Sequence, residues 1–222
     1  MTQASLASLY PFLHGKPQDS EKLDAALIHS VSVKAAESRA ASEAFFASQA
    51  EPLVAAAHAL AKMWKDGGRL FAMGNGGSSC DAAHVTVEFL HPITAGRPAL
   101  PAVQLGADLA MLTAVGNDIG FDQIFARQVE AQARDGDGLI GFSTSGNSAN
   151  LLEGFAVAKK RGLVTFGFAG GDGGKMKSSG LVDHLLVVDT QSVHRVQECH
   201  VAGYHILWDL VHTLLADSRG QP

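Results

Sequence analysis

From Gly68 onward, short apolar runs alternate with longer segments whose apolar residues recur at helical spacing. This alternation is typical of a parallel sheet that helices cover on both faces. Three of the runs are apolar almost throughout, as expected of strands buried on both sides. The predicted strands are Leu70–Met73, Ala102–Leu105, Gly138–Ser143, Val164–Ala169 and His184–Val188, and the predicted helices are Cys80–His91, Asp108–Val115, Phe121–Ala133, Ser148–Arg161 and Val193–Ala216. The sequence therefore predicts an α/β fold with a doubly wound, five-stranded parallel sheet, whose ligands bind beyond the carboxyl ends of the strands.

Two further helices are predicted before the first strand, and we interpret them as an N-terminal helical arm. The first extends from Ser20 to about Gln49, where apolar residues recur every three or four positions. The second begins at Glu51-Pro52, because proline suits the first turn of a helix, and ends at Gly67. Residues 1–20 are expected to form an irregular or partly helical extension. We therefore divide the chain into residues 1–66 and residues 67–222, packed as one unit.

Charge, cysteine content and hydropathy narrow the classes of partner. The chain has 17 Lys and Arg against 22 Asp and Glu and no basic block, so no direct nucleic-acid ligand is expected. No apolar run approaches the roughly 18 residues of a membrane-spanning helix. Cys80 and Cys199 lie far apart in a chain without a secretion signal, which indicates reduced thiols and a cytoplasmic location. The apolar composition and the leading helices favour a closed symmetric oligomer, a tetramer.

A glycine-rich turn, Gly74–Asp81, joins the first predicted strand to the helix that follows it. The first turn of a helix presents free backbone N–H groups and a partial positive charge, and glycines allow an anion to approach them closely. Phosphate is therefore one expected ligand, while a tight turn without a ligand is an equally good interpretation. The turn lacks the GxGxxG spacing and the lysine of a phosphate-binding nucleotide loop, so a nucleotide is not favoured.

A second turn, rich in hydroxyl groups, follows the third predicted strand. Ser143, Thr144, Ser145 and Ser148 lie where the next helix begins, and all four can donate hydrogen bonds to phosphate oxygens. Ser148 alone can be explained as a helix N-cap, but four hydroxyls in six residues exceed what capping needs. The absence of a nearby Lys or Arg favours a sugar phosphate over a triphosphate with its magnesium.

Four side chains on two predicted helices can converge on one metal ion or one substrate. His84 and Glu88 are spaced i, i+4 and share a helix face, and Gln197 and His205 can line one broad face of the last helix. Two histidines, a carboxylate and an amide oxygen suit zinc or a similar divalent ion. Spacing alone favours a simpler interpretation, a surface pair of His84 with Glu88 and a hydrogen-bonded core histidine at 205. The last helix also contains three other histidines: His194, His200 and His212.

In seven ordered stretches the chain resembles SIS-domain sugar isomerases of the phosphoheptose isomerase type. The matching stretches are Gly74–His84 (GNGGSSCDAAH), Glu88, Gly96–Val103 (GRPALPAV), Ala114–Phe121 (AVGNDIGF), Ser143–Asn150 (STSGNSAN), Gly171–Met176 (GDGGKM) and Arg195–His200 (RVQECH), with His205 beyond. The resemblance implies a flavodoxin-like sheet, a homotetramer and the conversion of sedoheptulose 7-phosphate to the aldose phosphate for heptose synthesis. Residues 67–222 would then be the SIS sugar-phosphate-binding domain.

The resemblance also implies roles for individual residues. Glu88 and His205 match the acid–base pair of the family. His84, Glu88, Gln197 and His205 match its zinc site, and the catalytic and structural roles of that ion both remain open. The substrate-binding positions are matched by Asn75, Gly76, Gly77, Ser78, Asn117, Asp118, Ser143, Thr144, Ser145, Ser148 and Gln197.

Two departures from the family leave the sugar specificity open. The family commonly has an arginine shortly after the catalytic glutamate, whereas Phe89–Ala95 contains none. It also has an acidic residue three positions before the glutamine, where this chain has His194. The alternatives are an isomerase of another sugar phosphate and a non-catalytic SIS protein, such as the adaptor that assembles replication initiators. Retention of both Glu88 and His205 argues against the adaptor.

Overall fold

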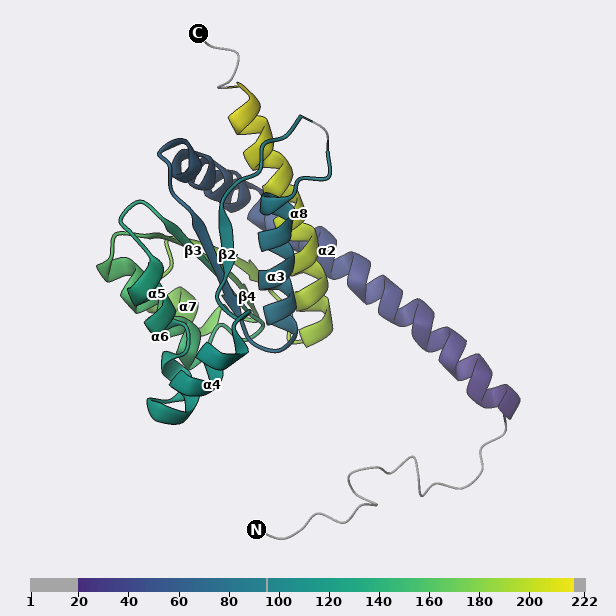
Figure 1. The fold of residues 1–222 in the computed structure, drawn as a ribbon. Coiled ribbons are helices and arrows are strands. Elements are labelled where there is room, and N and C mark those ends of the chain that lie inside the picture. Colours follow the sequence, from purple (N-terminus) through teal and green to yellow (C-terminus); the bar gives the residue numbers. More distant parts are fainter. Residues whose placement is uncertain (1–19, 95, 218–222) are drawn as a thin grey trace. The chain divides into compact units, whose positions relative to one another are not determined.

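The computed structural model describes residues 20–94 and 96–217, and its centre is a five-stranded, all-parallel sheet (Figure 1). The strand order is β2-β1-β3-β4-β5, the flavodoxin-like order, which confirms the predicted fold class. The strands are β1 (Leu70–Gly74), β2 (Ala102–Gln104), β3 (Gly138–Ser143), β4 (Val164–Gly170) and β5 (His184–Val188). Residues 1–19, predicted as an irregular extension, lie outside the described residues.

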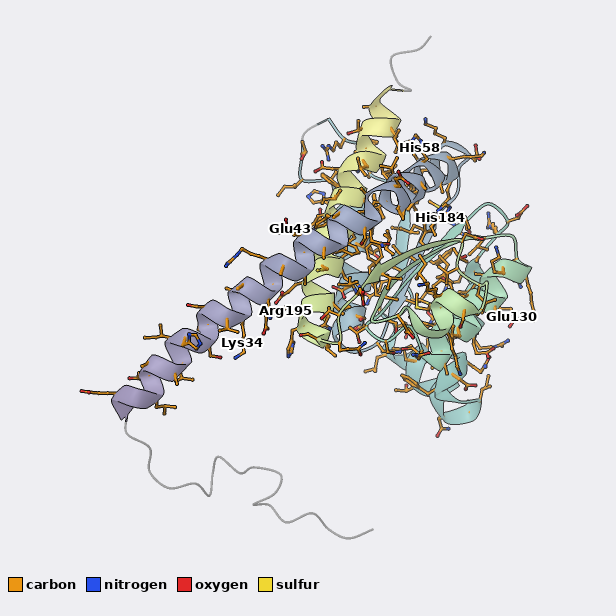
Figure 2. The ribbon with its side chains drawn as sticks, turned by 180° about the vertical axis from the view of Figure 1, so that it is seen from behind. Lys34, Glu43, His58, Glu130, His184 and Arg195 are labelled. Atoms are coloured by element: carbon orange, nitrogen blue, oxygen red, sulfur yellow. The ribbon has the colours of Figure 1, made fainter. Side chains whose placement is uncertain are left out.

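Two hydrophobic cores lie on opposite faces of the sheet, because successive side chains of a strand point to opposite sides. Leu70 and Ala72 of β1 face one core, and Phe71 and Met73 face the other. The first core is covered by residues 40–65 of α2 (Ser20–Lys65), by α3 (Gly77–Leu90) and by α8 (Val193–Asp217). The second is covered by α4 (Leu109–Asp118), η2 (Phe121–Gln123), α5 (Ala126–Gln132), α6 (Ala149–Lys160) and α7 (Gly174–Ser178). Side chains fill the space on both sides of the sheet (Figure 2).

Helix α2 corrects the prediction of two N-terminal helices, because it continues from Ser20 to Lys65 with Pro52 in its interior. Proline removes one helical hydrogen bond, to the carbonyl of Ser48, and normally kinks or ends a helix. Here both sides of the proline are held in the core, since Phe45 and Leu53 are each 2% exposed and Leu60 is fully buried. Burial of such side chains contributes roughly 1.5–3 kcal/mol each, which together outweighs the penalty of about 3 kcal/mol.

The chain divides into two compact units, residues 1–39 and residues 40–222, and the boundary lies within α2. The described part of the first unit is the helical segment 20–39. Its apolar side chains are largely exposed, with Leu27 at 56%, Ile28 at 70% and Val31 at 69%. The second unit contains the whole sheet and the rest of α2, so that residues 40–65 are part of the folded core rather than of a separate extension.

Other helices differ from the predictions at points that matter for the site. Helix α3 begins at Gly77 rather than Cys80, which places the glycine turn directly at its first residue. The helix predicted over 121–133 is divided into η2 and α5, with Gly120 at φ 139° ahead of η2. Helix α7 was not predicted, because its five residues follow a run of glycines and are too few to show a helical period.

Candidate active site

The two sequence-predicted turns meet at the carboxyl edge of the sheet, where β1 and β3 are neighbours. Gly74 at the end of β1 pairs with Phe142 near the end of β3. The connection after β1 leads to α3 on one face, whereas the connection after β3 leads to α6 on the other face. This is the point at which the strand order reverses, where α/β sheets commonly bind ligands.

A reciprocal pair of amides joins the two turns. The Asn75 Nδ2 donates to Asn150 Oδ1 at 2.8 Å, and the Asn150 Nδ2 donates to Asn75 Oδ1 at 2.8 Å. Asn75 belongs to the glycine turn, and Asn150, which is 3% exposed, lies in the first turn of α6. Two hydrogen bonds with matched geometry therefore hold the predicted substrate turn and the predicted phosphate turn side by side.

Glycine is required in the first turn because neighbouring groups fill the space of a side chain. A Cβ atom at Gly74 would collide with the main-chain oxygen of Ser78, and one at Gly77 would collide with the side-chain amide of Gln197. Gly76 has φ 54°, which lies in the left-handed region. The start of α3 therefore approaches Gln197 of α8 closely, and this approach brings two of the predicted sites together.

The hydroxyls of the second turn bond mainly to one another and to the turn itself. Ser143 Oγ lies 3.1 Å from Ser148 Oγ and accepts from the backbone N–H of Gly146 at 3.1 Å. Ser145 Oγ accepts from the backbone N–H of Asn147 at 3.2 Å. Ser148 occupies the N-cap position of α6 but makes no side-chain cap bond. The helix start therefore keeps donors available to an anion.

Three titratable side chains of α3 and α8 converge on one another. One ligand atom from each of His84, Glu88 and His205 lies within 4.8 Å of the others, and all three are half-buried. His84 Nε2 lies 3.1 Å from Glu88 Oε1, and the rings of His84 and His205 meet edge to face at 5.0 Å. His205 is thus not a separate core histidine, as spacing alone favoured. Two imidazoles and a carboxylate at this separation fit the donor set of a zinc ion.

The other histidines of α8 lie apart from this cluster. His200 is fully buried, donates one hydrogen bond from Nε2–H to the Ala169 carbonyl oxygen at 3.3 Å, and has its pKa lowered to about 4 by burial. His212 is 2% exposed and packs against Trp208 and Phe89. His194 is exposed in the first turn of α8, at the position where the family has an acidic residue.

Two buried residues that the sequence interpretation missed lie against His84. The Tyr204 hydroxyl is 2.7 Å from His84 Nδ1, and Tyr204 is 1% exposed. Asp81 is 5% exposed, and burial raises its pKa to about 6, although the nearby His84 acts in the opposite direction. Burial and the charges of Asp81 and Glu88 raise the pKa of the Tyr204 hydroxyl. The only available signal was position, since Asp81 is three residues before His84 and Tyr204 adjoins His205.

Arg97, the first arginine after Glu88, contacts α8. The Arg97 guanidinium lies 4.2 Å from the centre of the Trp208 ring and pairs with Asp209 at 2.9 Å. The Trp208 indole N–H donates to the Glu88 main-chain oxygen at 2.8 Å. Arg97 thus contacts a residue that supports the backbone of Glu88, and its cation–π contact contributes roughly 0.5–2 kcal/mol.

Asn117 and Asp118 lie at the end of α4, and both are exposed. The Asn117 Nδ2 donates to Asp118 Oδ1 at 2.8 Å. Among the described residues, no hydrogen bond joins this pair to His84, Glu88 or His205. Helix α4 packs against the second core, whereas α3 and α8, which bear the titratable cluster, pack against the first.

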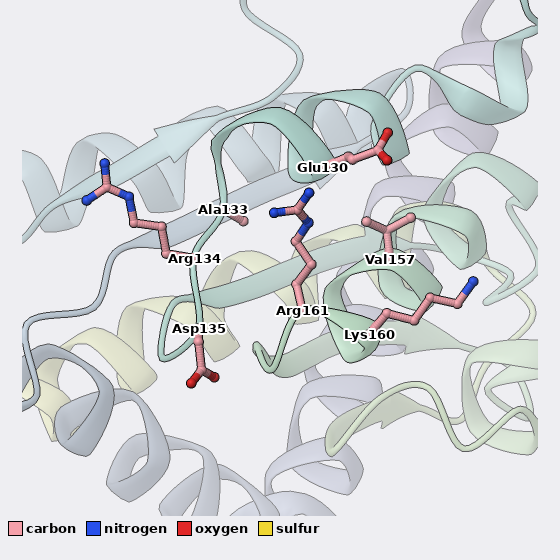
Figure 3. Close-up of a pocket in the computed structure, with 7 residues that line it drawn as sticks. All are labelled: Glu130, Ala133, Arg134, Asp135, Val157, Lys160 and Arg161. Atoms are coloured by element: carbon pink, nitrogen blue, oxygen red, sulfur yellow. The ribbon is translucent and has the colours of Figure 1, made fainter.

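Two cavities differ in their relation to this site. A hollow of about 550 Å³ lies at the C-terminal ends of α5 and α6, where the side chains of Arg134, Lys160 and Arg161 point in different directions (Figure 3). That end of α6 is opposite to the serine turn, so this hollow is remote from the predicted site. A second hollow, of about 380 Å³, is lined by Thr144, Ser145, Asn147 and the turns that follow β4 and β5. It adjoins the serine turn, but its lining does not include His84, Glu88 or His205.

Comparison with known proteins gives consistent results. A family model described as "SIS domain" matches residues 35–170. Phosphoheptose isomerase from Trichlorobacter lovleyi is 45% identical over 160 residues, covering 72% of this chain and 81% of that protein. Phosphoheptose isomerase from Chlorobaculum tepidum is 45% identical over 166 residues, covering 73% and 78%. The solved phosphoheptose isomerase from Neisseria gonorrhoeae has a TM-score of 0.79 at 38% identity, covering 84% of this chain and 99% of that chain.

Proposed function

The chain belongs to the phosphoheptose isomerase family of SIS-domain proteins, and we propose that it converts sedoheptulose 7-phosphate to D-glycero-D-manno-heptose 7-phosphate through an enediol. The observation that carries this proposal is the convergence of His84, Glu88 and His205 on α3 and α8, since α3 begins at the glycine turn. Glu88 and His205 support an isomerase more strongly than the glycine turn or the serine turn does, because a turn of either kind can also bind a sugar phosphate without chemistry. An aldose–ketose isomerisation needs one group that moves a proton between two carbons and another that moves protons on the oxygens.

We assign the carbon proton to Glu88 and the oxygen protons to His205. Glu88 takes a proton from C1 of the ketose and returns it to C2, while His205 donates to O2 and accepts the proton of the C1 hydroxyl. The Glu88 side chain is 24% exposed, which leaves it open to substrate while the surrounding protein excludes most water. The serine turn would bind the phosphate through Ser143, Thr144, Ser145 and Ser148 and the N–H groups at the start of α6.

We also propose that one zinc ion binds at each site through His84, Glu88, Gln197 and His205. The support is the mutual approach of His84, Glu88 and His205. The Gln197 amide also lies at the turn that opens α3, the helix that bears His84 and Glu88. When bound, a divalent ion supplies Lewis-acid polarisation of substrate oxygens. Metal analysis of protein purified without a chelator tests this assignment. Absence of zinc, with no gain of activity when zinc is added, would contradict it.

The remaining proposals concern assembly and location. Val87, Leu90 and Ile206 are 50%, 45% and 39% exposed on α3 and α8, which supports a homotetramer in which other copies cover them. Cys80 and Cys199 are both free thiols, which supports a cytoplasmic location. Among the described residues, no helix is both long and apolar enough to cross a membrane.

The decisive experiment is incubation of the protein with a panel of ketose phosphates of five, six and seven carbons in deuterium oxide, with and without zinc. We expect aldose formation and deuterium incorporation at C2 with sedoheptulose 7-phosphate. Reaction only with another member of the panel would reassign the substrate and leave the isomerase chemistry intact. Lack of both exchange and aldose formation with every member would favour a binding or adaptor role instead.

A further inference from the structure

The hydroxyl of Tyr204 occupies the side of His84 that faces away from Glu88. The Tyr204 Oη lies 2.7 Å from His84 Nδ1, whereas His84 Nε2 lies 3.1 Å from Glu88 Oε1. The Tyr204 ring also packs edge to face against His84 at 5.4 Å and against His205 at 4.9 Å. One buried aromatic residue therefore contacts both imidazoles of the converging cluster.

We propose that Tyr204 is a positioning residue: it fixes the ring orientation of His84, with Nε2 toward the site of a divalent cation, and its hydroxyl donates to Nδ1 while the site holds no cation. The proposal rests on the proposed metal site and extends it by one residue of the supporting shell. A histidine that binds a metal through one ring nitrogen almost always engages a partner through the other, and that partner sets its orientation and basicity.

A tyrosine hydroxyl can fill this role in both states of the site, because it can donate and accept a hydrogen bond. With no cation bound, Nε2–H donates to Glu88, and Nδ1 accepts from the Tyr204 hydroxyl. With a cation held at Nε2, Nδ1 would carry the ring proton and donate to the Tyr204 oxygen. The change of state needs a proton transfer between the two ring nitrogens and a rotation of the hydroxyl, but no movement of the His84 ring.

The simpler interpretation is that a buried tyrosine needs a hydrogen-bond partner and His84 happens to supply it. Two observations favour the positioning role. Tyr204 is held rigidly, at 1% exposure, between Phe142 at 5.8 Å and the two histidines. Among the described residues, the Tyr204 hydroxyl forms its hydrogen bond with His84 Nδ1, so no other partner competes for it.

The test compares Tyr204→Phe with Thr86→Val. Tyr204→Phe keeps the buried ring and removes only the hydroxyl. Thr86→Val removes a buried hydroxyl from α3, one that donates to the Ala82 carbonyl oxygen at 2.7 Å and does not contact His84. Zinc affinity is measured on metal-free protein by competition with a chromophoric chelator. We expect a loss of about 10- to 100-fold in Tyr204→Phe, the usual effect of removing such a partner, and a wild-type affinity in Thr86→Val.

A second readout does not depend on metal. In metal-free protein with ¹⁵N-labelled histidine, the His84 signals, assigned by their loss in His84→Gln, should show the proton on Nε2 in the wild type. Tyr204→Phe should show a mixture of tautomers. Unchanged zinc affinity in Tyr204→Phe, or a wild-type His84 spectrum with the proton on Nδ1, would overturn the proposal.

The outcomes separate this proposal from the proposed function. If wild-type protein binds no zinc, the metal site fails, and the tautomer of His84 alone decides whether Tyr204 positions it. If wild-type protein binds zinc and isomerises the substrate, but Tyr204→Phe matches it in affinity and spectrum, only the positioning role fails. If Tyr204→Phe does not fold, the wild-type spectrum still tests the hydrogen bond.

Discussion

Glu88 has three neighbours that act on different parts of the residue. His84 Nε2 faces its carboxylate at 3.1 Å, His205 joins the same cluster, and Trp208 bonds to its main-chain oxygen. The backbone of Glu88 is thus fixed independently of its side chain. A substitution of the Glu88 carboxylate therefore leaves the Trp208 hydrogen bond to the Glu88 main chain in place.

Glu88→Gln should abolish isomerisation while leaving the fold intact. Glutamine keeps the shape and hydrogen bonding of glutamate but lacks a basic oxygen, and loss of a general base is typically worth about 10²- to 10⁴-fold in rate. If Glu88 were only a surface partner of His84, stability would change by about half a kcal/mol and turnover would stay normal. Deuterium exchange at C1 of the ketose phosphate distinguishes the two roles, and exchange at the wild-type rate would show that Glu88 is not the base.

His200 should make the protein less stable in mild acid. Burial lowers its folded-state pKa from 6.5 to about 4, so the unfolded chain binds more protons between these values. Stability is therefore fully present above pH 6.5 and falls as the pH drops toward 4, by up to about 3 kcal/mol. Asp81, with a pKa raised to about 6, contributes the opposite slope between about pH 4 and 6.

The measurement is urea unfolding of wild type and His200→Leu at pH 7 and pH 5. We expect the wild type to lose more stability than the variant between the two pH values, because leucine does not titrate. Using the difference between pH values removes any packing change caused by the substitution itself. An equal loss in both proteins would show that His200 is not the group responsible.

At the scale of elements, the strands were predicted closely, and the exceptions arise from tertiary packing that a local pattern does not contain. β3 and β5 have the predicted bounds, because an apolar run bounded by polar residues is visible within a few positions. The α2 prediction was wrong at Pro52, since a local rule for proline does not include the burial of Phe45 and Leu53. The convergence of His84 with His205 needs two helices 120 residues apart to pack together, and spacing on one helix does not contain that information. Tyr204 was missed for the same reason.

Pro52→Ala should stabilise the helix that it interrupts. Alanine restores the N–H that proline lacks and is the best helix former, and part of the gain is offset because the unfolded chain becomes more flexible. We expect a net gain of roughly 1–2 kcal/mol in urea unfolding. The exposed neighbour Glu51→Ala serves as the control, with a change of no more than about 0.5 kcal/mol. A loss of stability would indicate that the proline bends α2 into the position that the core requires.

The serine turn makes a prediction of its own. Ser145→Ala combined with Ser148→Ala should raise KM for sugar phosphates, because two hydroxyls at the start of α6 are lost, at about 0.5–1.5 kcal/mol for each hydrogen bond. The matched control is Ser178→Ala on α7, which removes an exposed hydroxyl that bonds to the Gly174 carbonyl oxygen. Inhibition by inorganic phosphate gives a second measure of the same contacts. Equal KM in the double variant and the control would rule out the turn as the phosphate site.

At the scale of the whole molecule, the proposed tetramer accounts for the exposed apolar side chains on α3 and α8, the two helices that bear the candidate site. Val87 and Leu90 lie on the helix that bears Glu88, and Ile206 follows His205 directly. Sedimentation velocity at micromolar concentration should give a tetramer, and activity should fall on dilution together with dissociation. A monomeric species with full activity at every concentration would contradict the assembly. Val87→Lys should weaken assembly. Ile119→Lys, at the exposed end of α4, is the control and should leave the sedimentation coefficient unchanged.

The reciprocal amide pair of Asn75 and Asn150 has a consequence for the size of the substrate. The pair fixes the glycine turn, the predicted substrate turn, to the serine turn, the predicted phosphate turn, so the separation between the two turns is set by the backbone. A substrate must span that length with its own carbon chain, and each carbon too few leaves either the phosphate or the carbonyl out of place. We therefore expect kcat/KM to depend on the number of carbons more steeply than on the configuration of any single hydroxyl. The two asparagines thus select substrates by chain length, and we expect a seven-carbon sugar phosphate to give the highest kcat/KM.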